Sequence, residues 1–324
     1  MIGASATARR PLTHLGRMGV LGMNRRNIEL IAEYNPRKLL PHVDDKILTK
    51  ELVAGQGIKV AEVLAIIEHH GDFKAFKRIA EEAGELVIKP ARGSQGGGIF
   101  VASGGGPAGL RKPSGRLSGW DEIRFHVANI LAGMYSLGGG GDRVLVEERL
   151  EPHSSFDSIS FSGVPDLRMI VFRGVPVMAM LRLPTAESDG AANLHKGGVG
   201  AGITMETGTT NHAVQWDRSI TQHPDFLTEL TGFKVPDWEE ALLLSARLGD
   251  VVDIGYLGVD LVVDEKRGPV LLELNARPGM AIQIANSSGL HAPLAIIEAM
   301  DSIPEDPAAR VRLALDIERQ TRLR

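Results

Sequence analysis

The sequence of 324 residues contains no cysteine, which excludes disulfide bonds and thiolate metal sites and suits a reducing compartment. Aromatic residues make up only 5%, so a core has to rest on Leu, Ile, Val and Ala. No uninterrupted apolar run reaches about 18 residues, and we expect no membrane span. The net charge of −4 argues against a general nucleic-acid binder. These absences predict a soluble cytoplasmic protein with one large domain or two to three small lobes.

Acidic residues are missing from the first 28 positions, where five arginines occur: Arg9, Arg10, Arg17, Arg25 and Arg26. An Arg-rich, acid-poor start resembles a targeting segment, but the apolar stretch of a secretory signal is absent. We expect a basic arm that packs on the domain or meets an acidic partner.

The order of the remaining patterns predicts an α+β protein rather than a doubly wound parallel sheet. Apolar spacing, N-cap residues and glycine stops predict helices at 46–53, 72–83, 121–137, 237–248 and 304–324. Strands are expected at 86–90, 99–102, 144–147, 167–172, 175–183, 259–264 and 269–275. The apolar stretch 58–69 fits a strand or a short helix. We expect a mobile glycine-rich connection at 103–119 and an irregular insertion at 203–236.

The hairpin predicted over 258–275 brings two carboxylates together. If residues 265–268 form a four-residue loop, Asp264 faces Pro269, and counting back places Asp260 opposite Glu273. The other, apolar face would then be formed by Val259, Leu261, Leu272 and Leu274. Carboxylates that lie directly opposite each other repel, so this pair calls for a cation.

Asn275 shares a face with Glu273, because the two residues are two positions apart in a strand. Together with Asp260 they offer only oxygen ligands, which suit Mg²⁺ rather than Zn²⁺. The alternative is a solvated sheet face with no ion. The conformationally fixed turn Ala276-Arg-Pro-Gly, which follows at once, favours a built site.

Lys89 ends a predicted strand, and the glycine-rich loop 93–98 follows it. Glycines let backbone N–H groups approach phosphate oxygens closely, and Lys89 adds a cation. This is not a Walker A loop, because no Gly-Lys-Ser/Thr precedes a helix. A flexible turn is the common alternative for such a sequence. A loop that closed over phosphates would also keep water from a reactive intermediate.

Eight segments, in order between about Asp45 and Met300, resemble the ATP-grasp ligases. The likeness is strongest to the α-L-glutamate ligase-like group, related to the enzymes that add glutamate to a ribosomal protein. The segments are Asp45-Lys46, Lys89 to Gly98, Val146-Glu-Glu-Arg-Leu, Asp166-Leu-Arg168, Arg182, Asn193-Leu-His-Lys-Gly-Gly, Gly258-Val-Asp and Leu272-Glu-Leu-Asn-Ala-Arg-Pro-Gly. The resemblance implies the ATP-grasp fold, in which two α/β lobes with antiparallel sheets hold ATP between them.

The resemblance also implies a role for each matching residue. ATP phosphates would meet Lys46, Lys89 and the loop residues Gly93, Ser94, Gln95 and Gly96. The strand and hinge that hold adenine would be Glu147, Glu148, Arg149 and Leu150, and Asp166 would bind the ribose. Asp260, Glu273 and Asn275 match the Mg²⁺ ligands, with Glu273 bridging two ions and Mn²⁺ as an alternative metal. Arg182 and Asn193 would contact the γ-phosphate and the acyl-phosphate, with His195 and Lys196 beside them.

Two features depart from the family pattern. Only 44 residues precede the match, so the α/β domain that such ligases carry there would be largely missing and 1–44 would be its remnant. The resemblance divides the rest into a small lobe with the phosphate loop at 45–145, a large lobe with the metal site at 146–300, an insertion in it at about 205–236, and a helical tail at 301–324. Arg277 stands where the ribosomal-protein ligases have a small residue, so we interpret it as directed at substrate, with a structural ion pair as the alternative.

The resemblance therefore predicts a ligase that uses ATP to join a carboxylate to an amine through an acyl-phosphate. It would add glutamate or another amino acid to a peptide or small molecule. The alternatives are a phosphotransferase with the same phosphate machinery and a nucleotide-binding module that acts through a partner. Hydrolases are disfavoured, because the sequence contains neither G-x-S-x-G nor cysteine. A second copy or a partner protein would be one way to complete the site.

Overall fold

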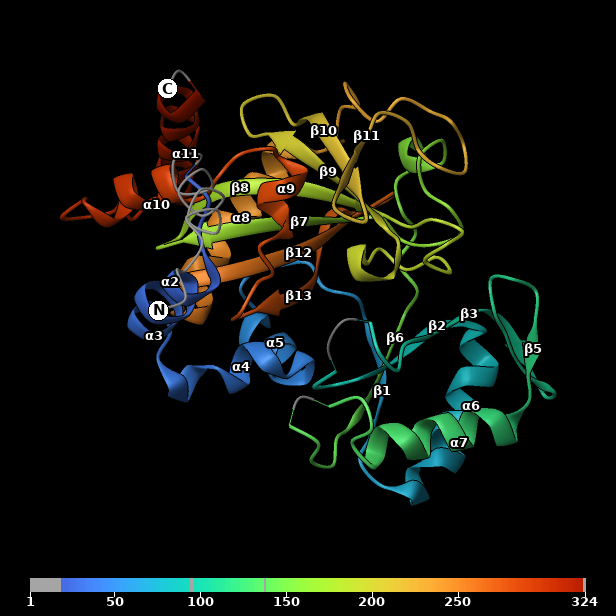
Figure 1. Ribbon diagram of the computed structural model, residues 1–324. Coiled ribbons are helices and arrows are strands. Elements are labelled where there is room, and N and C mark those ends of the chain that lie inside the picture. Colours follow the sequence, from blue (N-terminus) through green and yellow to red (C-terminus); the bar gives the residue numbers. More distant parts are fainter. Residues whose placement is uncertain (1–18, 94–95, 137, 323–324) are drawn as a thin grey trace, which may run out of the picture.

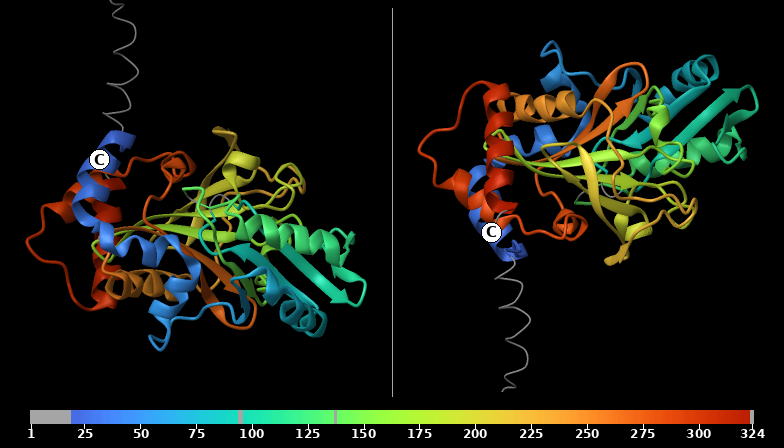
Figure 2. Two further views of the ribbon diagram at one scale, coloured as in Figure 1. Left: turned by 90° about the horizontal axis from the view of Figure 1, so that it is seen from below. Right: turned by 90° about the horizontal axis from the view of Figure 1, so that it is seen from above.

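The computed structural model describes residues 19–93, 96–136 and 138–322, which form two lobes, each built on one sheet (Figure 1). One sheet has six strands and the other seven. The two lobes lie side by side, as two further views show (Figure 2). Among the described residues, every ladder between named strands is antiparallel. This arrangement confirms the α+β prediction.

The smaller lobe contains the six-stranded sheet, in the order β1-β6-β2-β3-β4-β5. Its strands are β1 (Val63–Ile67), β2 (Glu85–Pro90), β3 (Phe100–Gly106), β4 (Gly109–Arg111), β5 (Leu117–Ser118) and β6 (Val144–Glu147). The stretch 58–69 thus contains a strand. The connection predicted at 103–119 is wrong, because it contains the end of β3 with β4 and β5. A Cβ on Gly105 would lie 2.6 Å from Leu110, so this glycine permits close strand packing.

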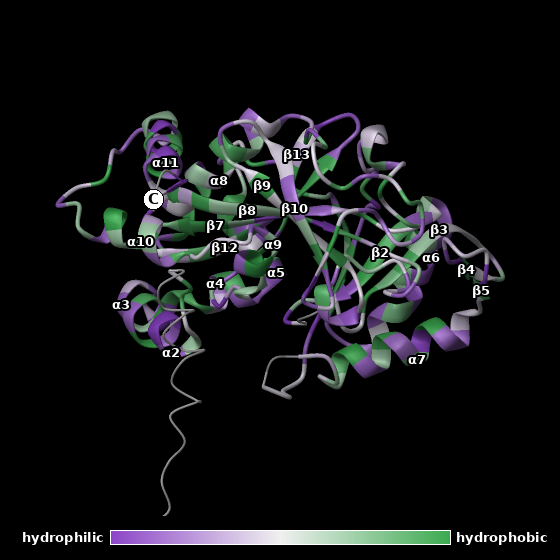
Figure 3. Ribbon diagram, turned by 45° about the horizontal axis from the view of Figure 1, so that its top comes forward, coloured by the Kyte–Doolittle hydropathy of each residue, from purple (hydrophilic) through white to green (hydrophobic). Residues whose placement is uncertain are grey.

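Helices α6 (Phe73–Ala83) and α7 (Trp120–Leu131) pack on one face of this sheet. Their buried side chains recur at helical spacing and include Phe73, Phe76, Ala80, Ile123, Val127 and Ile130. Hydrophilic and hydrophobic residues alternate along α7 (Figure 3). Leu86 and Ile88 of β2 join this core. Since side chains alternate along a strand, Lys89 points to the opposite face of the sheet.

The larger lobe contains the seven-stranded sheet, in the order β11-β10-β9-β8-β7-β12-β13. Its strands are β7 (Asp166–Phe172), β8 (Val175–Leu183), β9 (Val199–Thr204), β10 (Thr209–Gln215), β11 (Arg218–Ile220), β12 (Tyr256–Asp264) and β13 (Gly268–Asn275). The predicted hairpin over Arg173-Gly174 is confirmed, with Phe172 opposite Val175. The irregular structure predicted at 203–236 is wrong for its first part, because β10 and β11 complete the sheet there, whereas residues 221–236 contain no named helix or strand.

Both faces of strand β7 are covered, so all seven of its residues are buried. Met169 faces the core formed with helix α8 (Trp238–Val252). Ile170 faces a second core, which includes residues of α9 (Ala281–Ala285), α10 (His291–Glu298) and α11 (Pro307–Arg322). By alternation, Asp166 and Arg168 share the face of Ile170. None of the helices in the described ranges is long and apolar enough to cross a membrane.

Short helical segments lead from the first described residues to the lobes: α2 (Met23–Arg25), the π-helical η1 (Arg26–Ile31), α3 (Ala32–Tyr34), η2 (Arg37–Leu39), α4 (Pro41–Asp44) and α5 (Lys46–Val53). Leu21 and Leu30 are buried in the second core of the large lobe. Arg26 donates a hydrogen bond to the Pro278 carbonyl at 3.1 Å. This part of the predicted basic arm therefore packs on the large lobe. Arg9, Arg10 and Arg17 lie outside the described residues.

Candidate active site

The hairpin of β12 and β13 places two carboxylates opposite each other. Asp260 pairs with Glu273, as the sequence predicted. The predicted four-residue loop is wrong, because Asp264 pairs with Gly268 rather than with Pro269 and the loop has three residues. Gly268 adopts a left-handed φ of +68°, which favours glycine at this position of the turn.

A β-bulge restores the expected carboxylate pair. Leu261 pairs with Leu271, although Asp260 pairs with Glu273, so Leu272 is an extra residue in β13. The shorter loop and the bulge each shift the register by one position, and the two shifts cancel. The predicted apolar face is corrected at one position, since Leu271 joins the core with Leu261, whereas Leu272 packs against a separate group with Val262.

Asp260 is fully buried and lies between two arginines. Arg168 bonds both carboxylate oxygens, with Nε on Oδ1 and Nη2 at 2.6 Å from Oδ2. Arg182 donates through Nη2 to Oδ2 at 2.8 Å and through Nε to Asp166 at 2.5 Å. Burial alone would raise the pKa of Asp260, but the charges of Arg168 and Arg182 lower it well below its usual range. We call these four residues the arginine–carboxylate cluster.

Asp166 is the second acid of this cluster. Burial raises its pKa to about 7, opposed by Arg182 and reinforced by the negative charge of Asp260. The resemblance assigned Asp166 to the ribose. Its carboxylate accepts a hydrogen bond from Arg182, and its strand β7 pairs with β12 of the hairpin, so the ribose role stays a prediction.

Asn275 lies beside both carboxylates of the hairpin. Its Nδ2 is 3.2 Å from Asp260 Oδ2 and 3.4 Å from Glu273 Oε1, so the three predicted metal ligands converge. Asp260 Oδ2 accepts from Arg168, Arg182 and Asn275 together, whereas Oδ1 accepts from Arg168 alone among these donors, so Oδ1 is the oxygen better able to accept a further ligand.

This donor set fits Mg²⁺, which typically binds one or two carboxylates and completes its coordination with waters and phosphate oxygens. Within residues 19–93, 96–136 and 138–322, no group of three or more His, Cys, Asp or Glu gathers to hold a metal by itself. Two carboxylates and an amide therefore suit an ion that arrives with a phosphate ligand. Turning the amide over would present the Asn275 oxygen to that ion, because the two ends of an amide have opposite hydrogen-bonding character.

Lys46 connects Gly93, where the glycine loop begins, to the β12–β13 hairpin. Helix α5 begins at Lys46 because Asp45 caps it, accepting from the backbone N–H of Ile47 at 2.9 Å. Lys46 Nζ donates to the Gly93 carbonyl at 2.9 Å and lies 3.4 Å from Glu273 Oε2. The lysine predicted for phosphate and the glutamate predicted for metal are therefore neighbours.

Lys89 forms an ion pair with Glu147 in the small lobe, and only 4% of its side chain is exposed. Lys50 Nζ lies 2.7 Å from the other oxygen of Glu147. Burial alone would raise the pKa of Glu147, but Lys89 and Lys50 lower it below its ordinary value. Burial in turn lowers the pKa of Lys50, opposed by Glu147. Two lysines share one carboxylate, so this group carries an excess positive charge suited to an anion.

Of the residues predicted to hold adenine, Glu147 ends β6 and the other three follow it directly. Glu148 accepts from the backbone N–H of Glu62 at 2.8 Å, and Arg149 lies 3.3 Å from Glu85. Leu150 is 6% exposed and packs in the small apolar group that contains Val262. The hinge therefore touches both lobes.

The glycine loop begins at Gly93, which forms an isolated bridge with Ser136. A Cβ on Gly93 would lie 2.2 Å from the Pro90 side chain, so only glycine fits there. Gly96 has a left-handed φ of +68°. Ser94 and Gln95, the other predicted loop residues, lie outside the described residues.

The remaining predicted residues lie on the large lobe. Asn193 caps the short helix η5 (Leu194–Lys196), accepting from His195 N–H at 2.9 Å. Lys196 Nζ lies 4.0 Å from the position a Cβ on Gly96 would take, so this loop meets the phosphate loop. Arg277 Nη1 bonds both Asp44 oxygens at 3.0 Å, and 47% of its side chain is exposed.

A family model matches residues 25–299, and its description is sugar-transfer associated ATP-grasp. The match includes both lobes and most of the chain. The chain belongs to the sugar-transfer associated ATP-grasp family. Membership confirms the predicted ATP-grasp fold and assigns ATP and Mg²⁺ to the protein as cofactors. The closer likeness to the α-L-glutamate ligase-like group stays a prediction.

Solved ATP-grasp structures are similar to this family member at low identity. The precursor complex of the ligase PsnB is 14% identical, with a TM-score of 0.43, and the match covers 87% of this chain and 63% of that one. D-cycloserine synthetase DcsG is 18% identical, with a TM-score of 0.44, and the match covers 88% of this chain and 72% of that one. D-alanyl-alanine synthetase A from Vibrio cholerae is 13% identical, with a TM-score of 0.47, and the match covers 86% of this chain and 66% of that one. The chain thus spans less than two thirds of the length of PsnB. No curated protein matches the sequence.

Three residues that contact members of the predicted site were not among the predicted set. Arg168 is two positions after Asp166 and therefore on the same strand face, so alternation could have found it. Lys50 is four positions after Lys46, on the same side of α5. Asp142 accepts from the Arg92 backbone N–H at 3.1 Å and ends the glycine-rich stretch after α7. Its contact depends on the fold, and no local pattern marks it.

Proposed function

We propose that this ATP-grasp protein is an ADP-forming ligase that joins a carboxylate to an amine through an acyl-phosphate. The observation that carries the proposal is the meeting of oxygen donors and cations near the facing edges of the lobes. Lys46 Nζ is 3.4 Å from Glu273, and Arg182 Nη2 is 2.8 Å from Asp260. Transfer of a phosphoryl group from ATP needs this mixture, with anionic ligands for the ion and cations for the phosphate oxygens.

The proposed reaction has two steps. A carboxylate oxygen of the substrate attacks the γ-phosphorus, the bond from that phosphorus to the bridging oxygen breaks, and ADP leaves. The amine nitrogen then attacks the acyl carbon, a proton leaves the nitrogen, and phosphate departs as the amide forms. Neither step needs a covalent bond to the protein, which agrees with a chain that lacks cysteine.

The side chains described above divide the work. Lys46 and Arg182 would offset charge on the transferred phosphoryl group, and Arg182 is held ready by its bonds to Asp166 and Asp260. Asp260, Glu273 and Asn275 would hold Mg²⁺, which neutralises phosphate oxygens when it is bound. Lys89 would meet the nucleotide phosphates from the small lobe.

Asn193 and Arg277 would face the acid that becomes activated. Asn193 lies at the start of a loop whose Lys196 meets the glycine loop, so it would orient the acyl-phosphate. Arg277 would leave Asp44 to grip the substrate carboxylate with two parallel hydrogen bonds.

The substrates are proposed as a class. Glutamate is the first acid to test, because of the likeness to the glutamate ligases, and peptides are included for the same reason. The family's association with sugar transfer adds uronic acids and amino sugars. The experiment crosses a panel of acids with a panel of amines, measures phosphate release from Mg-ATP, and identifies products by mass spectrometry. We expect release that requires both an acid and an amine.

Two other outcomes would replace this proposal. A stable product that has gained a phosphoryl group, formed with a hydroxyl acceptor alone, would identify a phosphotransferase. Nucleotide binding without turnover for every pair would identify a binding module that works through a partner. A ligase product joins the two substrates with loss of one water, so its mass separates these cases.

We also propose that the protein works in the cytoplasm, because turnover requires ATP and the chain has no cysteine. Fractionation of cells that express the tagged chain tests the location. Recovery with membranes or in the medium would contradict it.

A further inference from the structure

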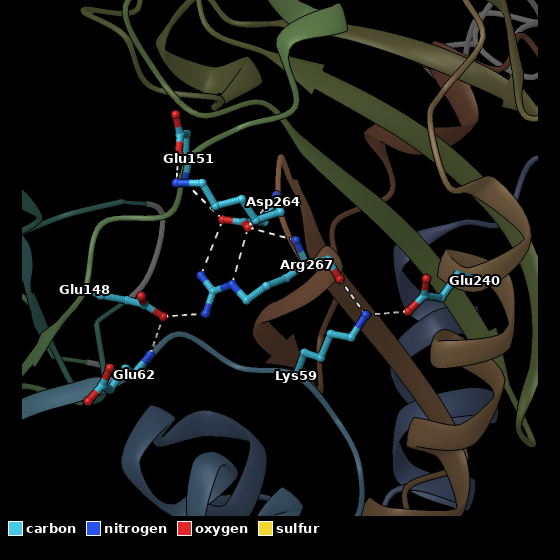
Figure 4. Close-up of polar contacts among 8 residues, drawn as sticks. Lys59, Glu62, Glu148, Glu151, Glu240, Asp264 and Arg267 are labelled. Atoms are coloured by element: carbon cyan, nitrogen blue, oxygen red, sulfur yellow. Dashed lines mark hydrogen bonds and ion pairs between the residues drawn. The ribbon is translucent and has the colours of Figure 1, made fainter.

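The two chain segments that connect the lobes both cross the tip of the β12–β13 hairpin. One runs through residues 59–62 into β1, and Val60 forms a parallel bridge with Leu271 while Leu271 N–H donates to the Lys59 carbonyl at 2.9 Å. The other leaves β6 through residues 148–152, where Pro152 bridges with Asp264. The metal hairpin therefore lies next to both connections (Figure 4).

Arg267, in the turn of this hairpin, forms hydrogen bonds both with the hairpin itself and with the hinge. Its Nε and Nη2 each lie 3.3 Å from an oxygen of Asp264, in a fork. Its Nη1 donates to Glu148 Oε1 at 2.5 Å. That oxygen also accepts from the Glu62 backbone N–H, so the guanidinium, the hinge and the first connection share one carboxylate. Figure 4 shows these contacts side by side.

Asp264 holds the guanidinium of Arg267, and Lys59 holds the backbone of the same turn. The Asp264 side chain is 4% exposed and accepts a hydrogen bond from the backbone N–H of Glu151, the residue directly after the hinge, at 3.1 Å. Burial alone would raise the pKa of Asp264, but the hydrogen bonds from Arg267 and Glu151 lower it. Lys59 Nζ bonds the Arg267 carbonyl and lies 2.7 Å from Glu240 of α8. The turn is thus tied to the large lobe as well as to the hinge.

We propose that Arg267 is a positioning residue for the nucleotide, which fixes the hinge at Glu148 relative to the metal ligands of the same hairpin. The inference rests on the proposed function, because it takes the nucleotide to span the hinge and the metal site. The side chains of Arg267 and Glu148 are 34% and 30% exposed, so this ion pair contributes little to folding stability. The ion pair instead sets the orientation of the hinge relative to the hairpin. A ligand that touches both ends needs that orientation, and one that touches only the hinge does not.

The test compares binding of Mg-ADP with binding of adenosine to the full chain, by calorimetry and by competition, at a temperature well below unfolding. In Arg267→Gln we expect Mg-ADP affinity to fall about tenfold and adenosine affinity to change less than threefold. Arg267→Lys keeps the charge without the fork and should lose less. The matched control is Lys266→Gln in the same turn, because Lys266 is 78% exposed and pairs with exposed Glu151. We expect the control to bind both ligands like wild type.

An unchanged ratio of the two affinities in Arg267→Gln, with wild type binding Mg-ADP, would overturn the inference and leave the proposed function intact. Equal losses for both ligands would also overturn it, since they indicate a hinge that has lost its own structure. If Arg267→Gln does not fold, the same ratio measured in Arg267→Lys decides. Failure of wild type to bind Mg-ADP would overturn the proposed function, and the inference with it.

Discussion

Lys46 Nζ lies 3.4 Å from the Glu273 carboxylate, which links helix α5 to the metal hairpin. The two side chains are 12% and 28% exposed, so the pair is open to an arriving ligand. A phosphate bound to a metal ion offers a negative charge to Lys46 and a positive charge to Glu273. We therefore expect Lys46 to turn to the phosphate and Glu273 to the ion. The pair is therefore interpreted as a site held ready rather than as a support for the fold.

The first prediction separates two neighbouring carboxylates. Glu273→Gln should lower Mg²⁺-dependent ADP formation at least tenfold with little loss of stability, because Glu273 is partly exposed. Asp260→Asn should in addition lower the free energy of unfolding by about 3–5 kcal/mol, because it leaves Arg168 buried without its anion and removes one of the two carboxylates that Arg182 bonds. A magnesium titration of ADP formation and urea unfolding measure the two effects. Equal stability losses in both variants would contradict this assignment.

The second prediction concerns pH. Asp166 has a pKa of about 7 in the folded protein, above its ordinary value near 3.9 in an unfolded chain. Between about pH 4 and pH 7 the folded state binds more protons, so this group makes stability fall as pH rises, by at most about 1.4 kcal/mol per pH unit. Asp166→Asn lacks this titration.

We therefore expect the unfolding free energy of wild type, relative to Asp166→Asn, to decline from about pH 4 to pH 7 and to level off above that. Urea unfolding of both proteins at several pH values provides the measurement. The comparison cancels the titration of groups that the two proteins share. A constant difference across the window would mean that Asp166 is ionised in the folded protein throughout.

The third prediction concerns Lys50, which shares Glu147 with Lys89. Lys50→Met should cost about 2 kcal/mol of stability or more, because it removes one of two cations from a carboxylate that is 3% exposed. Arg312→Gln is the control, since Arg312 and its partner Asp306 are 69% and 62% exposed. Its cost should stay within about 1 kcal/mol. Similar midpoints of urea unfolding for the two variants would count against a structural role for Lys50.

The fourth prediction concerns Arg277, which is bonded to Asp44 at the surface. Arg277→Lys should change stability by less than about 1 kcal/mol. If it binds the substrate carboxylate, the KM of the acid should rise about tenfold or more while nucleotide affinity stays the same, because lysine cannot form the fork. Steady-state kinetics with the active acid tests this. A loss of nucleotide affinity instead would assign Arg277 to the ATP site.

Local patterns were sufficient wherever one residue type decides the structure. Asp45 caps α5, Gly84 ends α6 with a left-handed φ of +69°, and the Arg173-Gly174 turn joins β7 to β8. Each of these signals acts within a few residues, so the sequence carries it directly.

Other elements depend on partners far away in the chain. The stretch 203–236 lacks clear alternation, yet β10 pairs with β9 and β11 because the sheet edge offers them partners. The glycines of β3 suggested flexibility, whereas close packing against Leu110 requires one of them. Tertiary context overrides local propensity in both cases.

The predicted site also contains some residues that local patterns place correctly and some contacts that depend on distant parts of the chain. Asp260, Glu273 and Asn275 converge as expected, since strand alternation places them on one face. The pairing of Asp260 with Arg168 and Arg182, and the burial of Lys89 against Glu147, required knowledge of which strands are neighbours. Arg277 faces Asp44, a contact across more than two hundred positions that no local spacing predicts.

The three-residue loop and the bulge at Leu272 also have a consequence for how this hairpin can change in evolution. The two irregularities compensate, so a one-residue insertion at Glu265–Arg267 keeps Asp260 opposite Glu273 only if Leu272 is deleted as well. Either change alone would move a carboxylate to the wrong sheet face, because side chains alternate with every residue. Among relatives, the lengths of the loop and of the strand after it should therefore vary together. Alignments that place a gap in one without the other would misalign Asp260 or Glu273, the predicted metal ligands.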